Sequence, residues 1–297
     1  TRAPAASGIR SGALALAAQG PNRLFAAAEP NRVLRLDSAL APAASAEVRG
    51  EILFAAPTDN GIAVLSQVAP DTSLVQWFVG DLAARGLRLL SDDLVPSHLL
   101  ADGKQVYVGY PDGRVVLLAP EAARVFEFNQ PLALMSQTDG AVLCALANAQ
   151  IQPVSKKSWK LLPHLPSRDA PNNDPIHMVA GGGRLAVQRG SGELALLDEP
   201  SGAAAPEAKE IRVPGLKPSW AAPVWFGNRL LVPQPDRLLL VEEDGSSRKL
   251  AFLPSAPSSC ALDGDELVCA LEGGWIAGLP VQELVAAAER ESAEGRN

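Results

Sequence analysis

The chain has 297 residues, with 26 lysines and arginines against 33 aspartates and glutamates, and a formal net charge of −7. This acidic balance argues against a general nucleic-acid binder, which needs a basic surface to neutralise phosphates. A composition of 47% hydrophobic and 20% charged residues excludes disorder of the whole chain and fits one large all-β domain or two average domains. Every apolar run is broken within about ten residues, so the sequence predicts no membrane-spanning helix.

Seven turn signals, built from Asn, Asp and Gly, each precede a short stretch of strand character. Neighbouring marks are 36 to 45 residues apart, and they stand at Asn22, Asn60, Gly103, Gly140, Gly183, Asn228 and Gly264. An apolar strand precedes each turn, and two further strands usually follow. A period near 40 residues with several strands per unit is typical of propeller blades. The chain therefore resembles the β-propeller superfamily over about residues 7 to 285.

This resemblance implies an all-β fold, a seven-bladed β-propeller of four-stranded antiparallel blades in one domain over residues 1–285. The expected blades cover residues 12–50, 51–93, 94–131, 132–167, 174–216, 217–255 and 256–285. The last blade lacks an obvious fourth strand, and residues 7–11 are expected to supply it and close the ring. No particular propeller family is matched, because the repeated motifs of WD40, sialidase-type, kelch and quinoprotein blades are absent or too rare. The fold alone therefore says little about function.

The C-terminal segment changes character, and residues 286–297 are expected to form a helical or frayed tail. Val281, Leu284 and Val285 fall on one helical face, followed by alanines and alternating charges. This small apolar face fits packing beside the last blade, and docking of a partner is the alternative.

A second repeated mark lies between the second and third strands of four units, at Pro30-Asn31, Pro70-Asp71, Pro111-Asp112 and Pro235-Asp236. Proline sets φ for the first turn position, and the Asp or Asn side chain caps the turn. Turn chemistry on one face of the ring explains these dipeptides. Ligand binding is the alternative, as in propeller lactonases that hold a calcium ion in the channel, and it would use Asp71, Asp112 and Asp236.

The cysteines bear on the cellular compartment. A two-residue turn at Gly264-Asp265 places Cys260 opposite Cys269 as a non-hydrogen-bonded pair, the kind whose side chains come closest. This pairing predicts either a cross-strand disulfide, which would imply an oxidising compartment, or two buried free thiols. Cys144 lies in a nearly identical local string, so it is expected at the equivalent core position of another blade.

The sequence contains no recognised nucleophile, phosphate-binding, calcium or zinc motif. Three histidines occur near the ends of predicted strands, and each is expected on the surface or in a loop: His98, His164 and His177. No cofactor and no metal are therefore expected.

Loops that join one blade to the next share a face with the proline-containing turns, and they include the longest irregular stretch, residues 166–175. The candidate interaction surface on this face consists of Tyr110, Asp112, Asp169, Asn172, Asn173, Trp220, Asp236 and Trp275. Exposed aromatic residues are typical anchors of protein interfaces. The alternative is that each aromatic caps its own blade core. Packing roles are expected for the tryptophans within strands, Trp77, Trp159 and Trp225.

Together these features predict a non-catalytic protein-interaction scaffold or accessory subunit of an extracytoplasmic bacterial assembly. Its partners would be proteins, with no nucleic acid and with membrane association only through a partner or a removed anchor. The start at Thr1 fits a mature chain after loss of a signal peptide or lipid anchor, or equally a shortened chain. The expected location is periplasmic or otherwise extracytoplasmic, and cytoplasmic is the alternative. The alternative function is a propeller enzyme or sensor that binds a small molecule or carbohydrate in the central channel.

Overall fold

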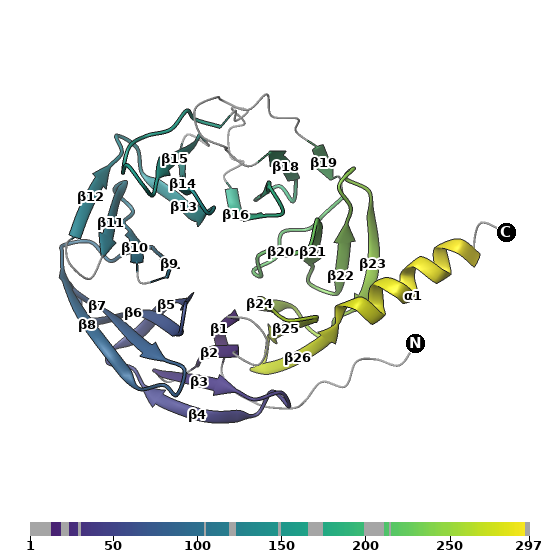
Figure 1. Cartoon of the computed structure of the whole chain (residues 1–297), viewed down its shortest axis with the longest axis horizontal. Helices are drawn as coiled ribbons and strands as arrows, with labels where there is room; N and C mark the ends of the chain where they lie inside the picture. Colours follow the sequence, from purple (N-terminus) through teal and green to yellow (C-terminus); the bar gives the residue numbers. More distant parts are fainter. Residues whose placement is uncertain are drawn as a thin grey trace.

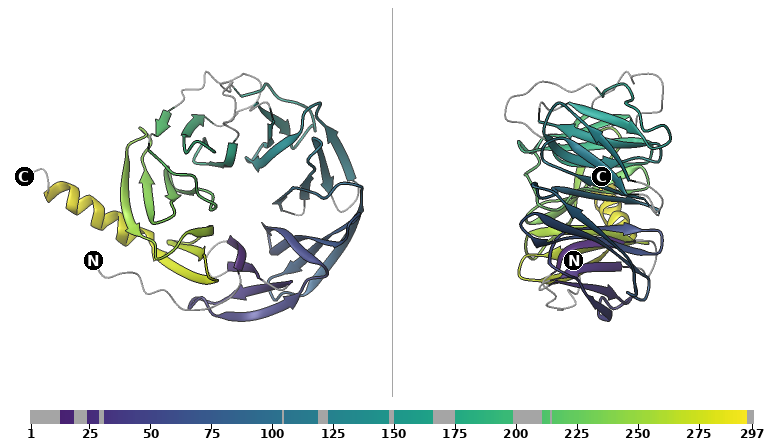
Figure 2. Two further views of the ribbon diagram at one scale, coloured as in Figure 1. Left: turned by 180° about the vertical axis from the view of Figure 1, so that it is seen from behind. Right: turned by 90° about the vertical axis from the view of Figure 1, so that its left-hand side faces the viewer.

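Seven antiparallel sheets surround a central axis in the computed structural model (Figure 1). The structure describes residues 13–18, 24–28, 31–103, 105–118, 123–147, 150–165, 175–198, 211–213 and 215–294. Within each sheet the strands follow one another in chain order from the axis to the rim (Figure 1). Figure 2 shows the resulting disc from behind and edge-on. The expected seven-bladed β-propeller is confirmed.

Blades 1 to 3 have four strands each. Blade 1 contains β1 (Ala13–Ala18), β2 (Leu24–Ala28), β3 (Arg32–Leu36) and β4 (Pro42–Glu47). Blade 2 contains β5 (Glu51–Thr58), β6 (Gly61–Ala69), β7 (Thr72–Val79) and β8 (Ala84–Ser91). Blade 3 contains β9 (His98–Asp102), β10 (Gln105–Gly109), β11 (Arg114–Leu118) and β12 (Ala123–Glu127).

Blades 5 and 6 also have four strands, whereas the described parts of blades 4 and 7 have three. Blade 4 contains β13 (Leu132–Gln137), β14 (Ala141–Leu146) and β15 (Ile151–Ser155). Blade 5 contains β16 (Pro175–Gly181), β17 (Arg184–Arg189), β18 (Leu194–Asp198) and β19 (Ile211–Val213). Blade 6 contains β20 (Val224–Phe226), β21 (Arg229–Pro233), β22 (Arg237–Val241) and β23 (Ser247–Phe252). Blade 7 contains β24 (Pro257–Asp263), β25 (Glu266–Leu271) and β26 (Trp275–Pro280).

The hydrophobic core lies between neighbouring blades, with one apolar cluster at each of the seven interfaces. The second strand of a blade is covered on both faces, so β14 is apolar and buried at every position. The outer strands lie at the rim of the ring, and β8 and β12 are exposed along nearly their whole length (Figure 1). Burial on both faces explains why the second strands lack the alternation of apolar and polar residues that a half-buried strand shows.

The outer strand expected in blade 4 does not form a ladder. Its segment, residues 159–165, makes only two isolated bridges to β15, at Leu161 and Leu165. Pro163 lacks an N–H group, and so does Pro153 on β15, so two of the donors that a regular ladder would need are missing. Four-stranded blades are therefore correct for five of the seven described sheets.

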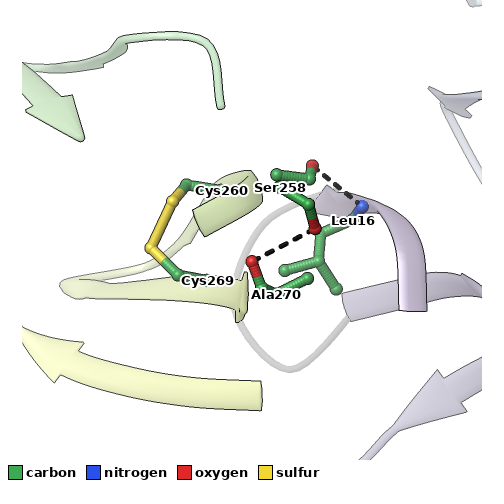
Figure 3. The surroundings of a disulfide bond; sticks show 6 residues. Leu16, Ser258, Cys260, Cys269 and Ala270 are labelled. Atoms are coloured by element: carbon green, nitrogen blue, oxygen red, sulfur yellow. Dashed lines mark hydrogen bonds between the residues drawn. A yellow bond between two sulfur atoms is a disulfide. The ribbon is translucent and has the colours of Figure 1, made fainter. Parts of the chain in front are cut away.

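The ring closes where β24 of blade 7 lies beside β1 of blade 1. The backbone N–H of Leu16 donates to Ser259 Oγ at 3.1 Å across this junction, close to Ser258 and Ala270 (Figure 3). Residues 7–11, expected to complete blade 7, lie outside the described residues.

The C-terminal helix α1 (Val281–Glu294) begins directly after β26 and runs outward past the rim of the ring (Figure 1). Val281 and Val285 are buried in the cluster between blades 6 and 7, and Leu284 packs against it. Arg229 of β21 forms an ion pair with Glu289 at 3.2 Å. The predicted apolar face of this helix therefore packs beside the last blade.

The hairpin of β24 and β25 has the predicted register, with Cys260 opposite Cys269. Gly264 in its turn has φ +63°, a conformation that glycine adopts without steric cost. The two Cα atoms are 4.2 Å apart, and a disulfide joins the side chains (Figure 3). Cys144 is free, fully buried and opposite Met135 in the corresponding strand pair of blade 4, as the sequence predicts.

Candidate functional site

The turns between second and third strands and the connections between blades lie on one side of the disc, here called the proline-turn face. The predicted interaction residues all come from these segments, but the structure does not keep them together as one exposed set. Three of them, Asp169, Asn172 and Asn173, lie outside the described residues.

Tyr110 and Asp112 are occupied by contacts within the fold. Arg114 donates to both carboxylate oxygens of Asp92, at 2.6 and 3.0 Å, and to Asp112 at 2.5 Å. Its guanidinium group lies 4.7 Å from the centre of the Tyr110 ring. Hydrogen bonding to Arg114 lowers the pKa of Asp92, while the two carboxylates raise the pKa of Arg114. Tyr110 is buried, so it caps its blade core and does not belong to the exposed surface.

Asp236 and Trp275 keep part of their surface accessible. Asp236 is exposed and accepts two hydrogen bonds from Arg237, at 2.9 and 2.8 Å, which lower the pKa of its carboxyl group. Trp275 begins β26 and is 37% exposed. Both therefore lie within reach of a partner, although Asp236 already has a charged neighbour.

Trp220 is the most exposed large hydrophobic residue of the described chain, with 82% of its surface accessible. It lies in the connection from β19 to β20, whose residues 215–223 we call the Trp220 loop. Leu216, Ser219 and Ala221 of this loop are buried. The loop is therefore anchored on both sides of the exposed indole.

Two buried glutamine side chains hold the backbone of the Trp220 loop. Gln234, just after β21, accepts from the Lys217 N–H at 2.6 Å and donates to the Lys217 carbonyl at 3.0 Å. Gln188 of β17 donates to the same carbonyl at 3.3 Å. Because these side chains come from blades 5 and 6, the loop is fixed to two rigid sheets. Buried hydrogen bonds of this kind are costly to break without replacement.

A histidine provides a further anchor next to Trp220. His177 Nε2 lies 2.7 Å from the Ser219 carbonyl oxygen, which only accepts, so this nitrogen carries the hydrogen. Burial lowers the pKa of His177, and the bond to Ser219 opposes that shift. The sequence placed His177 and His98 on the surface or in loops, and this is wrong for both, because they lie partly buried in the inner strands β16 and β9. His164 is exposed, as expected.

This arrangement is suited to presenting a large apolar side chain without loss of loop entropy. Lys217, Asp236 and Arg237 provide charged groups near the loop, and the charge of Lys217 contributes to the lowered pKa of Asp236. An aromatic anchor with a polar rim is the usual anatomy of a protein-binding hot spot. The glutamine anchors were missed from the sequence. Gln188 is a single amide within the apolar strand β17, which indicates a buried polar contact but not its partner, and Gln234 lies after the end of β21.

The packing tryptophans behave as expected. Trp77, Trp159 and Trp225 are partly buried against three different interface clusters. Trp225 Nε1 donates to the Val179 carbonyl at 3.0 Å.

The structure does not bring the channel carboxylates of the alternative function together. Asp71 accepts from Thr72 Oγ1 at 3.1 Å. Asp112 accepts from Arg114, and Asp236 accepts from Arg237. Within the described ranges, no group of three or more His, Cys, Asp or Glu side chains is placed to hold a metal ion. The described part of the chain also has no helix with the length and hydropathy needed to cross a membrane.

Comparison with known proteins supports the fold assignment and bears on nothing else. No protein-family model matches the chain, and no curated protein matches its sequence. Among solved structures, BamB from Moraxella catarrhalis is similar over 92% of this chain and 98% of its own, with 14% identity and a TM-score of 0.65. The β-propeller domain of Cps50 (Swd1) from Myceliophteria thermophila is similar over 94% of this chain and 99% of its own, with 11% identity and a TM-score of 0.72. At these identities the likeness shows the propeller fold.

Proposed function

We propose that this propeller is a non-catalytic protein-interaction module, a scaffold or accessory subunit that docks a protein partner on the Trp220 loop. The observation that carries the proposal is the exposed indole of Trp220 on a backbone fixed by His177, Gln188 and Gln234. A preorganised anchor binds with little ordering cost, so most of its contact energy contributes to affinity.

The setting proposed for this module is an extracytoplasmic bacterial assembly. The disulfide between Cys260 and Cys269 supports this setting, because such bonds persist in oxidising compartments. The net charge of −7 and the carboxylates already engaged by arginines favour protein contacts over nucleic acid or a channel metal.

The test is quantitative co-purification from the source organism with three tagged variants, Trp220→Ala, Trp220→Phe and Val125→Ala. Val125 is an apolar side chain 53% exposed on the outer strand β12, away from the Trp220 loop, and serves as the control. Truncation of an interface hot spot costs about 2 to 4 kcal/mol, so Trp220→Ala should lower partner recovery at least about thirtyfold. Trp220→Phe should retain part of the affinity, and Val125→Ala should leave it unchanged.

Equal partner recovery with all three variants would show that the Trp220 loop is not the docking site. A chain that purifies alone with stoichiometric metal would contradict the non-catalytic module itself and direct attention to the central channel.

A further inference from the structure

The outer strand of blade 2, β8, has features that the proposed function does not use. It is an eight-residue strand at the rim of the ring (Figure 1), and no further strand pairs with its outer edge among the described residues. Natural sheets protect such edges with proline, inward charges, short length or a covering element. The fourth strands of the other four-stranded blades follow this rule: β4 begins at Pro42, β12 and β19 are shorter, and α1 lies against β23. β8 is longer than these strands and has neither a proline nor a covering element among the described residues. Its edge is guarded only by two arginines, Arg85 and Arg88, and by a bulge at Arg85, all of which leave Leu87 and Leu89 in regular pairing.

Hydrogen-bond alternation shows which backbone groups of β8 are available. The Asp92 N–H donates to the Asp71 carbonyl at 3.0 Å, so this pair is of the hydrogen-bonded kind in the ladder of β7 and β8. Counting back, Leu90 and Arg88 bond inward, whereas Leu89 and Leu87 direct both N–H and C=O away from β7. Two neighbouring docking positions for an added strand therefore lie on Leu87 and Leu89.

The side chains on the two faces of β8 differ in chemistry. Leu87 and Leu89 are 49% and 64% exposed on the face toward blade 1. The opposite face looks onto a cleft of about 520 Å³ between blades 2 and 3, whose lining includes Trp77, two arginines, Arg85 and Arg88, and one carboxylate, Asp59. The strand carries two arginines and no carboxylate, in a chain with a net charge of −7. One face therefore fits apolar side chains, and the other fits acidic ones.

We propose that β8 is a docking edge for an extended segment of a partner protein in which apolar and acidic residues alternate. The segment would add a fifth strand to blade 2, with backbone bonds to Leu87 and Leu89, apolar side chains beside these leucines, and carboxylates toward Arg85 and Arg88. Strand addition of this kind gains affinity from main-chain bonds and specificity from alternate side chains. A second copy of this chain fits the edge less well, since each copy would bring two guanidinium groups to the shared edge.

The test uses a fluorescein-labelled peptide of sequence TVELEVT, whose valines and leucine share one face and whose glutamates share the other. Two control peptides are TVKLKVT, with reversed charge, and TVEPEVT, in which a central proline interrupts the strand. Fluorescence anisotropy with the whole chain should show binding of TVELEVT, and at least about tenfold weaker binding of both controls.

Three variants separate edge pairing from charge and from folding. Leu89→Pro removes an outward N–H while sparing the inward ladder, so it should weaken TVELEVT binding at least about tenfold with an unchanged circular dichroism spectrum. Leu89→Val keeps the N–H and should bind within about twofold of the wild type. Arg85→Glu, an exposed change that leaves the backbone intact, should weaken TVELEVT binding and strengthen TVKLKVT binding.

No binding of TVELEVT up to about 1 mM, or equal binding of all three peptides, would overturn the proposal. Sedimentation equilibrium that detects a dimer abolished by Leu89→Pro would also overturn it, since the edge would then serve a second copy. This surface is separate from the Trp220 loop, so either site can fail without the other.

Discussion

Acidification should destabilise this protein partly through one histidine of an inner strand. His98 begins β9, where its ring stacks on Phe54 with centroids 6.2 Å apart, and Ser97 Oγ lies 2.8 Å from Nδ1. Burial lowers the pKa of His98 to about 4, and a backbone bond to Ala133 opposes the shift. In the unfolded chain the same imidazole titrates near 6.5.

The difference in pKa between the folded and the unfolded chain sets the sign and the size of the stability change. As the pH falls below 6.5 the unfolded chain binds a proton at His98 that the folded chain does not, so the stability present at neutral pH declines toward pH 4. At 1.36 kcal/mol for each unit of pKa, the loss is about 2 kcal/mol at pH 5 and about 3 kcal/mol at pH 4. Hydrogen bonding to Arg114 lowers the pKa of Asp92. Protonation of this carboxylate should therefore destabilise the folded chain further at lower pH.

Urea unfolding followed by circular dichroism at about pH 7 and about pH 5 would measure the effect in the wild type, His98→Gln and His164→Gln. The glutamine at position 98 cannot titrate, so this variant should lose about 2 kcal/mol less than the wild type between the two values. His164 is exposed, and His164→Gln is the matched control for the loss of a histidine. If His98→Gln and the wild type lost equal stability, the argument from burial of His98 would be refuted.

Three further predictions concern the Trp220 loop and the disulfide. Gln234→Leu should cost about 2 kcal/mol in urea unfolding and speed hydrogen exchange of the Lys217 amide, because it removes the acceptor of the Lys217 N–H; slow exchange in the variant would contradict this. Trp220→Ala should change the free energy of unfolding by less than about 0.5 kcal/mol, and a larger loss would assign the indole to packing. Reduction of the Cys260–Cys269 bond should lower the free energy of unfolding by up to about 2 to 3 kcal/mol. Thiol titration of the denatured, unreduced chain should count one free thiol, whereas a count of three would show that the pair is reduced.

The fold could be predicted because its signals are local and repeat seven times. A two-residue turn fixes the register of its hairpin, so the facing of Cys260 and Cys269 followed from counting residues. The irregular outer segment of blade 4 was harder to predict. Pro153 and Pro163 lie in different segments, and only when the two segments lie side by side does one ladder lack two N–H donors.

The candidate site was predicted less completely, because side-chain burial depends on contacts between blades. Trp220 was identified with its loop, but Tyr110 was expected at the surface and is buried beneath Arg114. His98 and His177 were misplaced for the same reason: the inner strands are covered by both neighbouring blades, which a single-strand pattern does not show. The two hydrogen bonds between Gln234 and Lys217 join the end of β21 to the Trp220 loop, and no local pattern indicates such a pairing.

The most direct test of the proposed docking site is amine cross-linking and mass spectrometry of the protein in its native complex. Lys217 is exposed on the Trp220 loop, and Lys157 is exposed in the turn after β15, on the opposite face of the disc. The proposal predicts reproducible intermolecular cross-links from Lys217 to one partner, with none from Lys157 to that partner. Cross-links confined to Lys157, or a chain that remains a lone monomer, would contradict it.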